Sequence, residues 1–195
     1  MTEKLEEINA IAEIVGDWFY KHNILAHSNY DKQLIKFAEE VEEIDTASNE
    51  FELLDAIGDT LVVCVGLSML NYKRYYSFIH TTPRYSKDLT IQHIKDKRVV
   101  NPYCTLLDSF IDYYGVDKVL KGFKMAALTI HFRTGQIVDG IFVKDKPTNT
   151  ILVPNSNLIH HDINHLIYNV ERLAERHRLD KFKIDFSGNA KLTWI

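Results

Sequence analysis

The feature that most constrains the fold of this chain is a pair of helical patterns separated by only two polar residues. Apolar side chains recur at helical spacing over residues 30–47 and again over residues 50–70, and Ser48 and Asn49 stand between the two patterns. Because so short a connection cannot span the length of a helix, the second helix must turn back along the first. The sequence therefore predicts an antiparallel helix hairpin at the centre of the fold.

The predicted hairpin is strongly acidic. Nine carboxylates and no base fall within residues 37–63, although the formal net charge of the whole chain is only −4. The acids are Glu39, Glu40, Glu42, Glu43, Asp45, Glu50, Glu52, Asp55 and Asp59. Two helices that hold carboxylates toward each other are one way in which a protein binds hard divalent cations.

Four of these acids have a spacing that matches across the turn. Counted from Asn49, Glu43 lies six residues before the turn and Asp55 six residues after it. Glu40 lies nine residues before the turn and Asp59 ten residues after it. At about 1.5 Å of rise per residue, each pair falls at nearly the same height on the facing helices. We therefore expect the four carboxylates to converge on one small volume, where their mutual repulsion would require cations.

A solvated acidic face is the alternative interpretation, and it suits Glu42, Asp45 and Glu50. It does not suit Asp59, because residues 60–70 are apolar nearly all round and are predicted to be buried. A buried aspartate without a partner is costly, so a cation is expected near it. Gly58, the preceding residue, lacks a side chain and predicts a close approach by another group.

The remaining patterns predict a mainly all-α fold, a helical bundle around the hairpin, with a small C-terminal β appendage. Helices are expected over residues 3–22, 89–97, 102–114, 116–132 and 158–179, with a link over residues 22–29. Residues 136–143 and 148–153 alternate or are β-branched and suggest a hairpin, and residues 181–186 suggest a strand.

Composition is that of an ordinary soluble globular protein. The chain has 195 residues, 46% of them hydrophobic and 26% charged, enough for one domain with an appendage. The net charge of −4 gives no general attraction to nucleic acid or to an anionic membrane. Cys64 and Cys104 lack CxxC spacing and are predicted to be free thiols. The longest apolar run, residues 60–70, is shorter than the roughly 20 residues that span a bilayer. These features predict a cytoplasmic protein without a membrane or nucleic-acid partner.

The EExxE pattern of one known family is present in the first helix of the hairpin. Glu39-Glu40-Val41-Glu42-Glu43, with residues 31–37 before it, resembles the all-α nucleoside triphosphate pyrophosphohydrolases of the MazG-like group. The family continues with ExxD on the next helix; here Asp59 takes the aspartate position, whereas Ala56 stands at the glutamate position. Residues 55–63 are similar to the variant found in small phage and bacterial members, and residues 133–143 resemble their closing segment. Asp55, about 40° from Asp59 around the helix, is expected to replace the missing glutamate.

The resemblance implies an enzyme that converts an NTP or dNTP to the monophosphate and pyrophosphate. Residues 1–145 would form the catalytic domain and residues 146–195 an extension packed on it, and small family members predict a homodimer or homotetramer. Mg²⁺ or Mn²⁺ would be the cofactor. The expected metal ligands are Glu40, Glu43, Asp55 and Asp59, the catalytic candidates are Glu39 and Glu40, and the substrate-binding candidates are Lys36, Trp18, Lys73, Arg74 and Arg84.

Two other classes of function remain open from the sequence. The first is a non-catalytic module that binds metal or nucleotide, because Ala56 replaces a family acid. The second is an HD-type or zinc hydrolase. His161 and His165 have zinc-compatible i, i+4 spacing, and His161-Asp162 looks like the central dyad of HD phosphohydrolases. Bases in residues 72–100 could contact substrate phosphates or could belong to a solvated loop.

Overall fold

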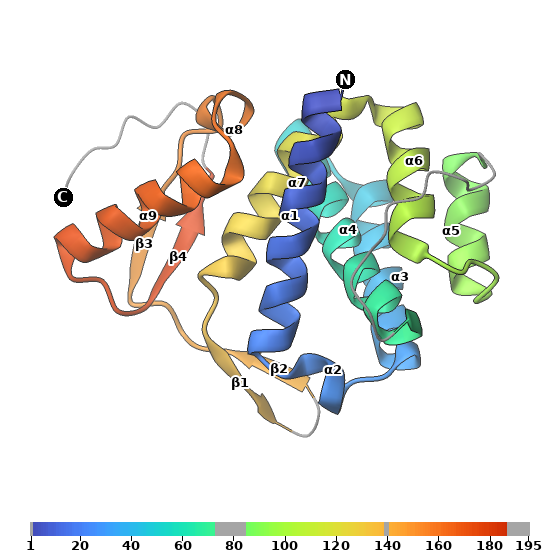
Figure 1. Cartoon of the computed structure of the whole chain (residues 1–195), viewed down its shortest axis with the longest axis horizontal. Coiled ribbons are helices and arrows are strands. Elements are labelled where there is room, and N and C mark those ends of the chain that lie inside the picture. Colours follow the sequence, from blue (N-terminus) through green and yellow to red (C-terminus); the bar gives the residue numbers. More distant parts are fainter. Residues whose placement is uncertain (1, 73–84, 139–140, 187–195) are drawn as a thin grey trace.

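The fold is mainly helical, as the sequence predicts, with small two-stranded sheets near the C-terminus. The computed structural model describes residues 2–72, 85–138 and 141–186. Helices account for 71% of these residues. Figure 1 shows the helices gathered into one bundle, with the C-terminal strands and their helices packed at one side of it.

The long helix α4 (Glu50–Tyr72) lies at the centre of the bundle. It packs against α1 (Thr2–Lys21), α3 (Tyr30–Thr46), α6 (Pro102–Tyr114) and α7 (Val116–His131). A helix that is apolar on nearly every side must be surrounded by other elements, and four neighbouring helices surround α4. In the described part of α4, the exposed side chains lie in the first turn, at residues 50–52, and at Asn71.

By length and composition alone, α4 could also cross a membrane. Residues 50–71 meet the usual hydropathy criterion, but 78% of the most apolar stretch is buried inside the protein. Burial of this kind is typical of the central helix of a helical bundle, and the composition by itself is weak evidence for a membrane span.

The α3–α4 hairpin has the predicted antiparallel form, and side chains of its turn stabilise it. The Asn49 side chain accepts a hydrogen bond from the backbone N–H of Glu52 at 3.0 Å. The Glu52 carboxylate accepts in return from the backbone N–H and the hydroxyl of Ser48, each at 2.7 Å. This reciprocal pattern satisfies backbone donors at the start of α4, in the manner of a capping box.

Helices α4 and α7 cross at a pair of glycines. A Cβ atom placed on Gly58 would collide with the carbonyl oxygen of Gly122, and one placed on Gly122 would collide with the carbonyl oxygen of Leu54. The close approach predicted at Gly58 is therefore made by the backbone of α7. Its role is in helix packing, directly beside Asp59.

Two details of the N-terminal half differ from the sequence-based prediction. The expected link over residues 22–29 contains a short helix, α2 (Ile24–His27), which packs on α1. Helix α5 runs over Lys87–Lys95, two residues earlier than predicted, because Ser86 caps it by accepting a hydrogen bond from the N–H of Leu89.

The strand pairing also differs from the prediction. Strands β1 (Gly135–Val138) and β2 (Ile141–Lys144) form the antiparallel hairpin. Strand β3 (Asn149–Leu152) pairs in parallel with β4 (Phe182–Asp185) and has no partner in that hairpin. A parallel pair requires a long crossover, which the helices between these strands provide.

The helix predicted over residues 158–179 is in fact two helices. They are α8 (Asn157–His160) and α9 (Ile163–His177), separated by His161 and Asp162. The Asp162 side chain accepts a hydrogen bond from the N–H of His165 at 3.0 Å and so caps α9. Aspartate is a favoured residue at the N-cap of a helix, so a new helix begins directly after Asp162.

A fully buried lysine ties the C-terminal segment to the bundle. Lys124 on α7 is 0% exposed, and its ammonium donates to the carbonyl oxygens of Leu158 at 2.7 Å and of His161 at 2.8 Å. The carboxylate of Glu7 on α1 lies 2.6 Å from the same nitrogen. A buried ammonium requires this degree of pairing, so the charge specifies how three parts of the chain meet.

Candidate functional site

The four predicted carboxylates lie on the two helices of the hairpin, Glu40 and Glu43 on α3 and Asp55 and Asp59 on α4. Glu40, Asp55 and Asp59 are partly buried, whereas Glu43 is exposed. The neighbouring charge that most affects Glu40 is Asp59, and the one that most affects Asp55 is Glu43. Both of these charges come from the facing helix of the hairpin, which is compatible with the matched heights that the spacing predicts.

Burial and mutual repulsion alter the acidity of the site. Burial, followed by the charges of Asp59 and Glu43, raises the pKa of Glu40 to about 7. Burial and the charge of Asp55 raise the pKa of Asp59 to about 6. Burial and Glu43 also raise the pKa of Asp55. Carboxyl groups with raised pKa values gain most from a nearby cation, which favours their ionised form.

Two cations beside the carboxylates were absent from the sequence-based set of candidates. Arg133 and Lys144 both lower the pKa values of Asp55 and Asp59, against the effect of burial. Burial in turn lowers the pKa values of Arg133 and Lys144. The β1–β2 register explains their proximity, because it pairs Gly135 with Lys144, and Arg133 lies only two residues before Gly135. The signal available in the sequence was that Arg133 begins the segment that resembles the closing segment of the family and that Lys144 directly follows it.

The carboxylates do not converge as tightly as predicted. Within the described residues, no three histidine, cysteine, aspartate or glutamate side chains lie close enough together to hold a metal ion. Like charges repel, and Arg133 and Lys144 give Asp55 and Asp59 an alternative source of compensation. The predicted four-carboxylate cage is thus not preformed.

The oxygen donors nevertheless suit Mg²⁺ in chemistry. Mg²⁺ is commonly held by one or two carboxylates together with phosphate oxygens of a substrate, and it needs no complete protein cage. Glu40 with Asp59, or Glu43 with Asp55, would supply such carboxylate oxygens. Any one of these carboxylates can therefore share an ion with a bound phosphate.

Ala56 stands where the resembled family has a glutamate, and its position explains why Asp55 is the relevant acid. Ala56 is 1% exposed and belongs to the core. A glutamate at this position would bury its charge in apolar surroundings unless the helix rotated. Asp55 is partly exposed and near Glu43, so it lies on the carboxylate face of α4.

The other predicted site residues have different surroundings. Glu39 is exposed and forms an ion pair with Lys36 one turn earlier, and the charges of both act on Glu40. Trp18 is 7% exposed, and its ring contacts Phe142 and His22 at centroid distances of 5.1 and 4.8 Å. It therefore presents no open face for a nucleobase to stack on.

The basic substrate-binding candidates Lys73, Arg74 and Arg84 lie outside the described residues. Two other bases of this part of the chain pair with acids of α3. Lys87 lies 3.5 Å from Asp45, and Lys97 forms an ion pair with Asp31. These pairs favour a surface role for Lys87 and Lys97.

The alternative histidine site receives no support from the geometry. The rings of His161 and His165 stack with their centroids 4.8 Å apart, but Asp162 is engaged as the cap of α9. The described residues offer these histidines no further ligand with which to complete a metal site. The two histidines are therefore better described as a stacked pair at the start of α9 than as part of a metal site.

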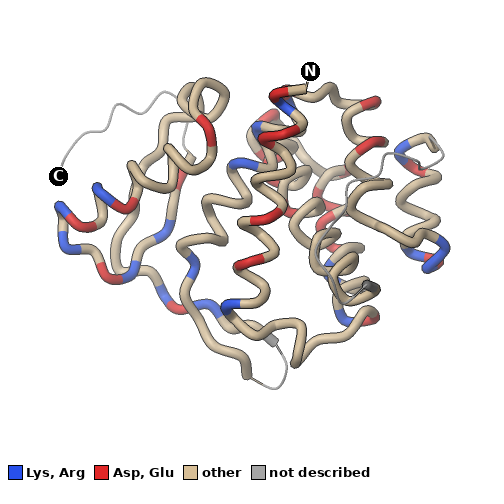
Figure 2. The backbone as a smooth tube through the Cα atoms, viewed as in Figure 1, with Lys and Arg blue, Asp and Glu red and all other residues tan. Residues whose placement is uncertain are grey.

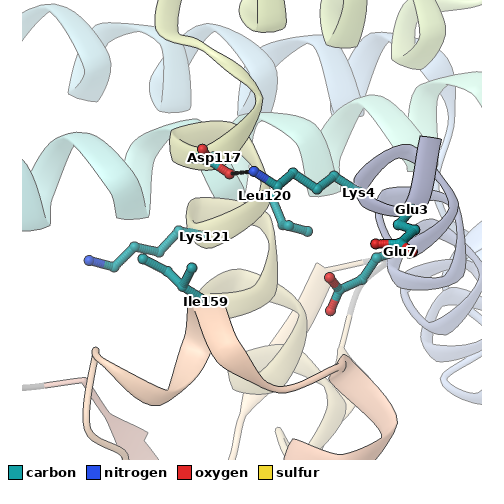
Figure 3. Close-up of a pocket in the computed structure, with 7 residues that line it drawn as sticks. All are labelled: Glu3, Lys4, Glu7, Asp117, Leu120, Lys121 and Ile159. Atoms are coloured by element: carbon teal, nitrogen blue, oxygen red, sulfur yellow. Dashed lines mark hydrogen bonds and ion pairs between the residues drawn. The ribbon is translucent and has the colours of Figure 1, made fainter. Parts of the chain in front are cut away.

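A separate pocket of about 200 Å³ lies between α1, α7 and α8. Its lining consists of Glu3, Lys4, Glu7, Asp117, Leu120, Lys121 and Ile159. Figure 3 shows the ion pair between Lys4 and Asp117 at its edge. None of the predicted site residues lines this pocket, so it is unrelated to the carboxylate site.

Comparison with known proteins identifies no relative of this chain. No family model matches it, and neither a curated protein nor a solved structure matches it. The resemblance to the MazG-like group therefore consists of the motif itself, and the functional argument depends on the residues of this chain.

The raised pKa of Asp59 predicts that Asp59→Asn stabilises the metal-free protein at neutral pH. The folded-state pKa of about 6 exceeds the ordinary value of 3.8, so the folded protein holds this proton more tightly than the unfolded chain. The protonated carboxyl of Asp59 therefore contributes to the free energy of unfolding below about pH 4, and this contribution is lost as the pH rises through about 6. The uncharged asparagine avoids this loss, and we expect a gain of roughly 1 to 3 kcal/mol above pH 7, since one pKa unit corresponds to about 1.4 kcal/mol.

Urea unfolding of both proteins in EDTA from pH 3.5 to 8 measures this difference. The gain should be small at pH 3.5 and should grow with pH. A difference that stays constant across the range would show that Asp59 has an ordinary pKa.

Proposed function

We propose that this protein is a Mg²⁺-dependent nucleotide pyrophosphohydrolase that converts an NTP or dNTP to the monophosphate and pyrophosphate. The observation that carries this proposal is the placement of Glu40, Glu43, Asp55 and Asp59 on the two helices of one hairpin, where burial and their mutual charges raise the pKa values of Glu40, Asp55 and Asp59. An arrangement with this concentration of negative charge suits a substrate that arrives with divalent cations.

The residues of the site divide into two chemical groups. Glu40, Glu43, Asp55 and Asp59 supply hard oxygen ligands, and Arg133 and Lys144 supply positive charge beside them. Bound Mg²⁺ would neutralise charge on the phosphates and orient the reacting phosphoryl group. Arg133 can add bidentate hydrogen bonds to phosphate oxygens, and Lys144 can contribute a compact charge.

Glu39 is the candidate for positioning the attacking water. Its carboxylate is at the surface, beside Glu40, and Lys36 holds it through an ion pair. A carboxylate that is fixed in this way can accept a hydrogen bond from water without occupying the metal-ligand positions. Phosphoryl transfer depends mainly on positioning and charge neutralisation, so no covalent nucleophile is needed.

A panel of NTPs, dNTPs and modified nucleotides, with pyrophosphate release as the readout, tests this function. We expect at least one nucleotide to be hydrolysed in the presence of Mg²⁺, and we expect EDTA to abolish the release. Restoring excess Mg²⁺ or Mn²⁺ should recover it. Hydrolysis that persists in EDTA, or no hydrolysis of any nucleotide in the panel, would reject the proposal.

A binding module without catalysis is the second candidate, because the carboxylates do not form a preformed group of three within the described residues. In that case the hairpin would hold a nucleotide and Mg²⁺ without turnover. Calorimetric binding of a nucleotide that the protein leaves intact after prolonged incubation would favour this candidate over the enzyme.

A further inference from the structure

A strongly basic pocket adjoins the carboxylate site. It has a volume of about 270 Å³ and lies where the β1–β2 hairpin meets β4 and the end of α7. Its polar lining consists of Thr129, Arg133, Thr134, Lys144, Asp145, Lys146, Lys181 and Lys183, and Pro147, Phe182 and Ile184 complete it. Figure 2 shows basic positions gathered in this region, between the hairpin and the start of β4.

Bases outnumber acids in the lining of the pocket, and two of the bases, Arg133 and Lys144, also face Asp55 and Asp59. Five bases line it, whereas Asp145 is the one acid in the lining. The carboxylate of Asp145 lies 3.2 Å from the ammonium of Lys181 and also accepts a hydrogen bond from the side chain of Thr134. Lys146 and Lys183 are exposed, and each adds a positive charge to the lining. An anionic ligand would relieve the repulsion among these cations.

Two residues of the pocket lining also interact with the carboxylate site. Arg133 and Lys144 line the pocket, and their charges also act on Asp55 and Asp59. Burial and the neighbouring charge of Arg133 disfavour the charged form of Lys144, which lowers its pKa. An anion between these two cations would therefore stand beside the carboxylates that are the candidate metal ligands.

The size of the pocket limits the kind of anion. Sites that enclose whole drug-sized ligands usually measure roughly 300–1,000 Å³, so this pocket suits a fragment better than a complete nucleotide. Phosphate oxygens are well matched by an arginine, several lysines and threonine hydroxyls. A pyrophosphate unit combines small size with enough negative charge to balance most of the lining.

We propose that this basic pocket binds the pyrophosphate portion of the substrate, which leaves as the product. The inference rests on the proposed function. It also gives the C-terminal segment a role in the site, because Lys183 lies in β4 and Lys181 directly precedes that strand. In this arrangement the carboxylates lie beside the phosphoanhydride bond that is broken, and the basic pocket holds the pyrophosphate that leaves.

Calorimetric titration with inorganic pyrophosphate, in EDTA, tests the pocket independently of catalysis. We expect Lys183→Glu to weaken pyrophosphate binding about tenfold or more, since the change replaces a charge-assisted contact with a repulsive one. Lys95→Glu is the matched control, because Lys95 is an exposed lysine on α5, away from the pocket, and the change in net charge is the same. The control should bind pyrophosphate within about twofold of the parent protein.

A competition experiment distinguishes the substrate from a separate effector. A saturating nucleoside triphosphate analogue that resists hydrolysis should displace pyrophosphate, and simultaneous binding of both would overturn the assignment of the pocket to the substrate. Unchanged pyrophosphate affinity in Lys183→Glu would also overturn it, even if the protein hydrolyses nucleotides. Conversely, loss of that affinity in a protein that hydrolyses no nucleotide supports the phosphate site and rejects the proposed enzyme function.

Discussion

Asp59→Asn is expected to reduce pyrophosphate release by about 100-fold or more while leaving the helical fold intact. Asp59 interacts with both charged groups of the site. Its charge raises the pKa of Glu40, and the charges of Asp55, Arg133 and Lys144 act on its own pKa. Asparagine has nearly the same shape but lacks the negative charge, so it would be a much weaker ligand for Mg²⁺. The loss should appear mainly in kcat, with circular dichroism unchanged.

Glu42→Gln is the matched control for this variant. Glu42 belongs to the same acidic hairpin and occupies a variable position of EExxE, but its side chain is exposed and is not among the charges that shift the pKa values of Glu40, Asp55 and Asp59. We expect its activity to remain within about threefold of the parent protein, as is usual for a surface substitution. Equal losses in the two variants would indicate that the overall acidity of the hairpin matters and that the specific site does not exist.

Gly58→Ala is expected to destabilise the protein by about 3 kcal/mol. Helix propensity alone predicts the opposite sign, because alanine is favoured over glycine in a helix interior by about 1 kcal/mol. Here the added methyl group would collide with the carbonyl oxygen of Gly122 and would lie 2.8 Å from the Cβ of Ala126. A backbone oxygen cannot rotate away as a side chain can, so α4 and α7 would have to separate.

Urea unfolding, at a pH where the parent protein unfolds in a two-state transition, measures this effect. The variant should unfold at a lower urea concentration, with an unchanged dependence of the unfolding free energy on urea. Gly122→Ala should give a loss of similar size, because its Cβ would collide with the carbonyl oxygen of Leu54. The double variant should lose less than the sum of the two, since a single separation of the helices relieves both collisions. A stability gain in either single variant would mean that α4 and α7 are further apart than the structure shows.

Local features of the sequence were sufficient for the helical part of the fold. The hairpin was predictable because its apolar periodicity and its short turn restrict the chain to one arrangement, and helix α6 begins and ends at the predicted residues. The same geometry places Glu40 near the height of Asp59 and Glu43 near the height of Asp55, because rise per residue is nearly constant in a helix, and the charges of Asp59 and Glu43 on their facing partners are compatible with this.

Features that depend on distant segments were not predictable in this way. The parallel pairing of β3 with β4 joins strands about 30 residues apart, and short strands carry little information about their partners. The break before Ile163 follows from the capping by Asp162, a residue that helical periodicity does not distinguish.

For the candidate site, the sequence by itself determined the carboxylates, the height at which each stands and the chemistry that they favour. Only the tertiary structure decided which cations stand beside them. Arg133 and Lys144 are more than 70 residues away from Asp59 in the chain. Arg133 is near Asp59 because it follows α7, which packs on α4, and the β1–β2 register places Lys144 opposite Gly135. Electrostatic effects depend on distance through space, so no spacing along the chain could reveal these partners or the basic pocket that they share.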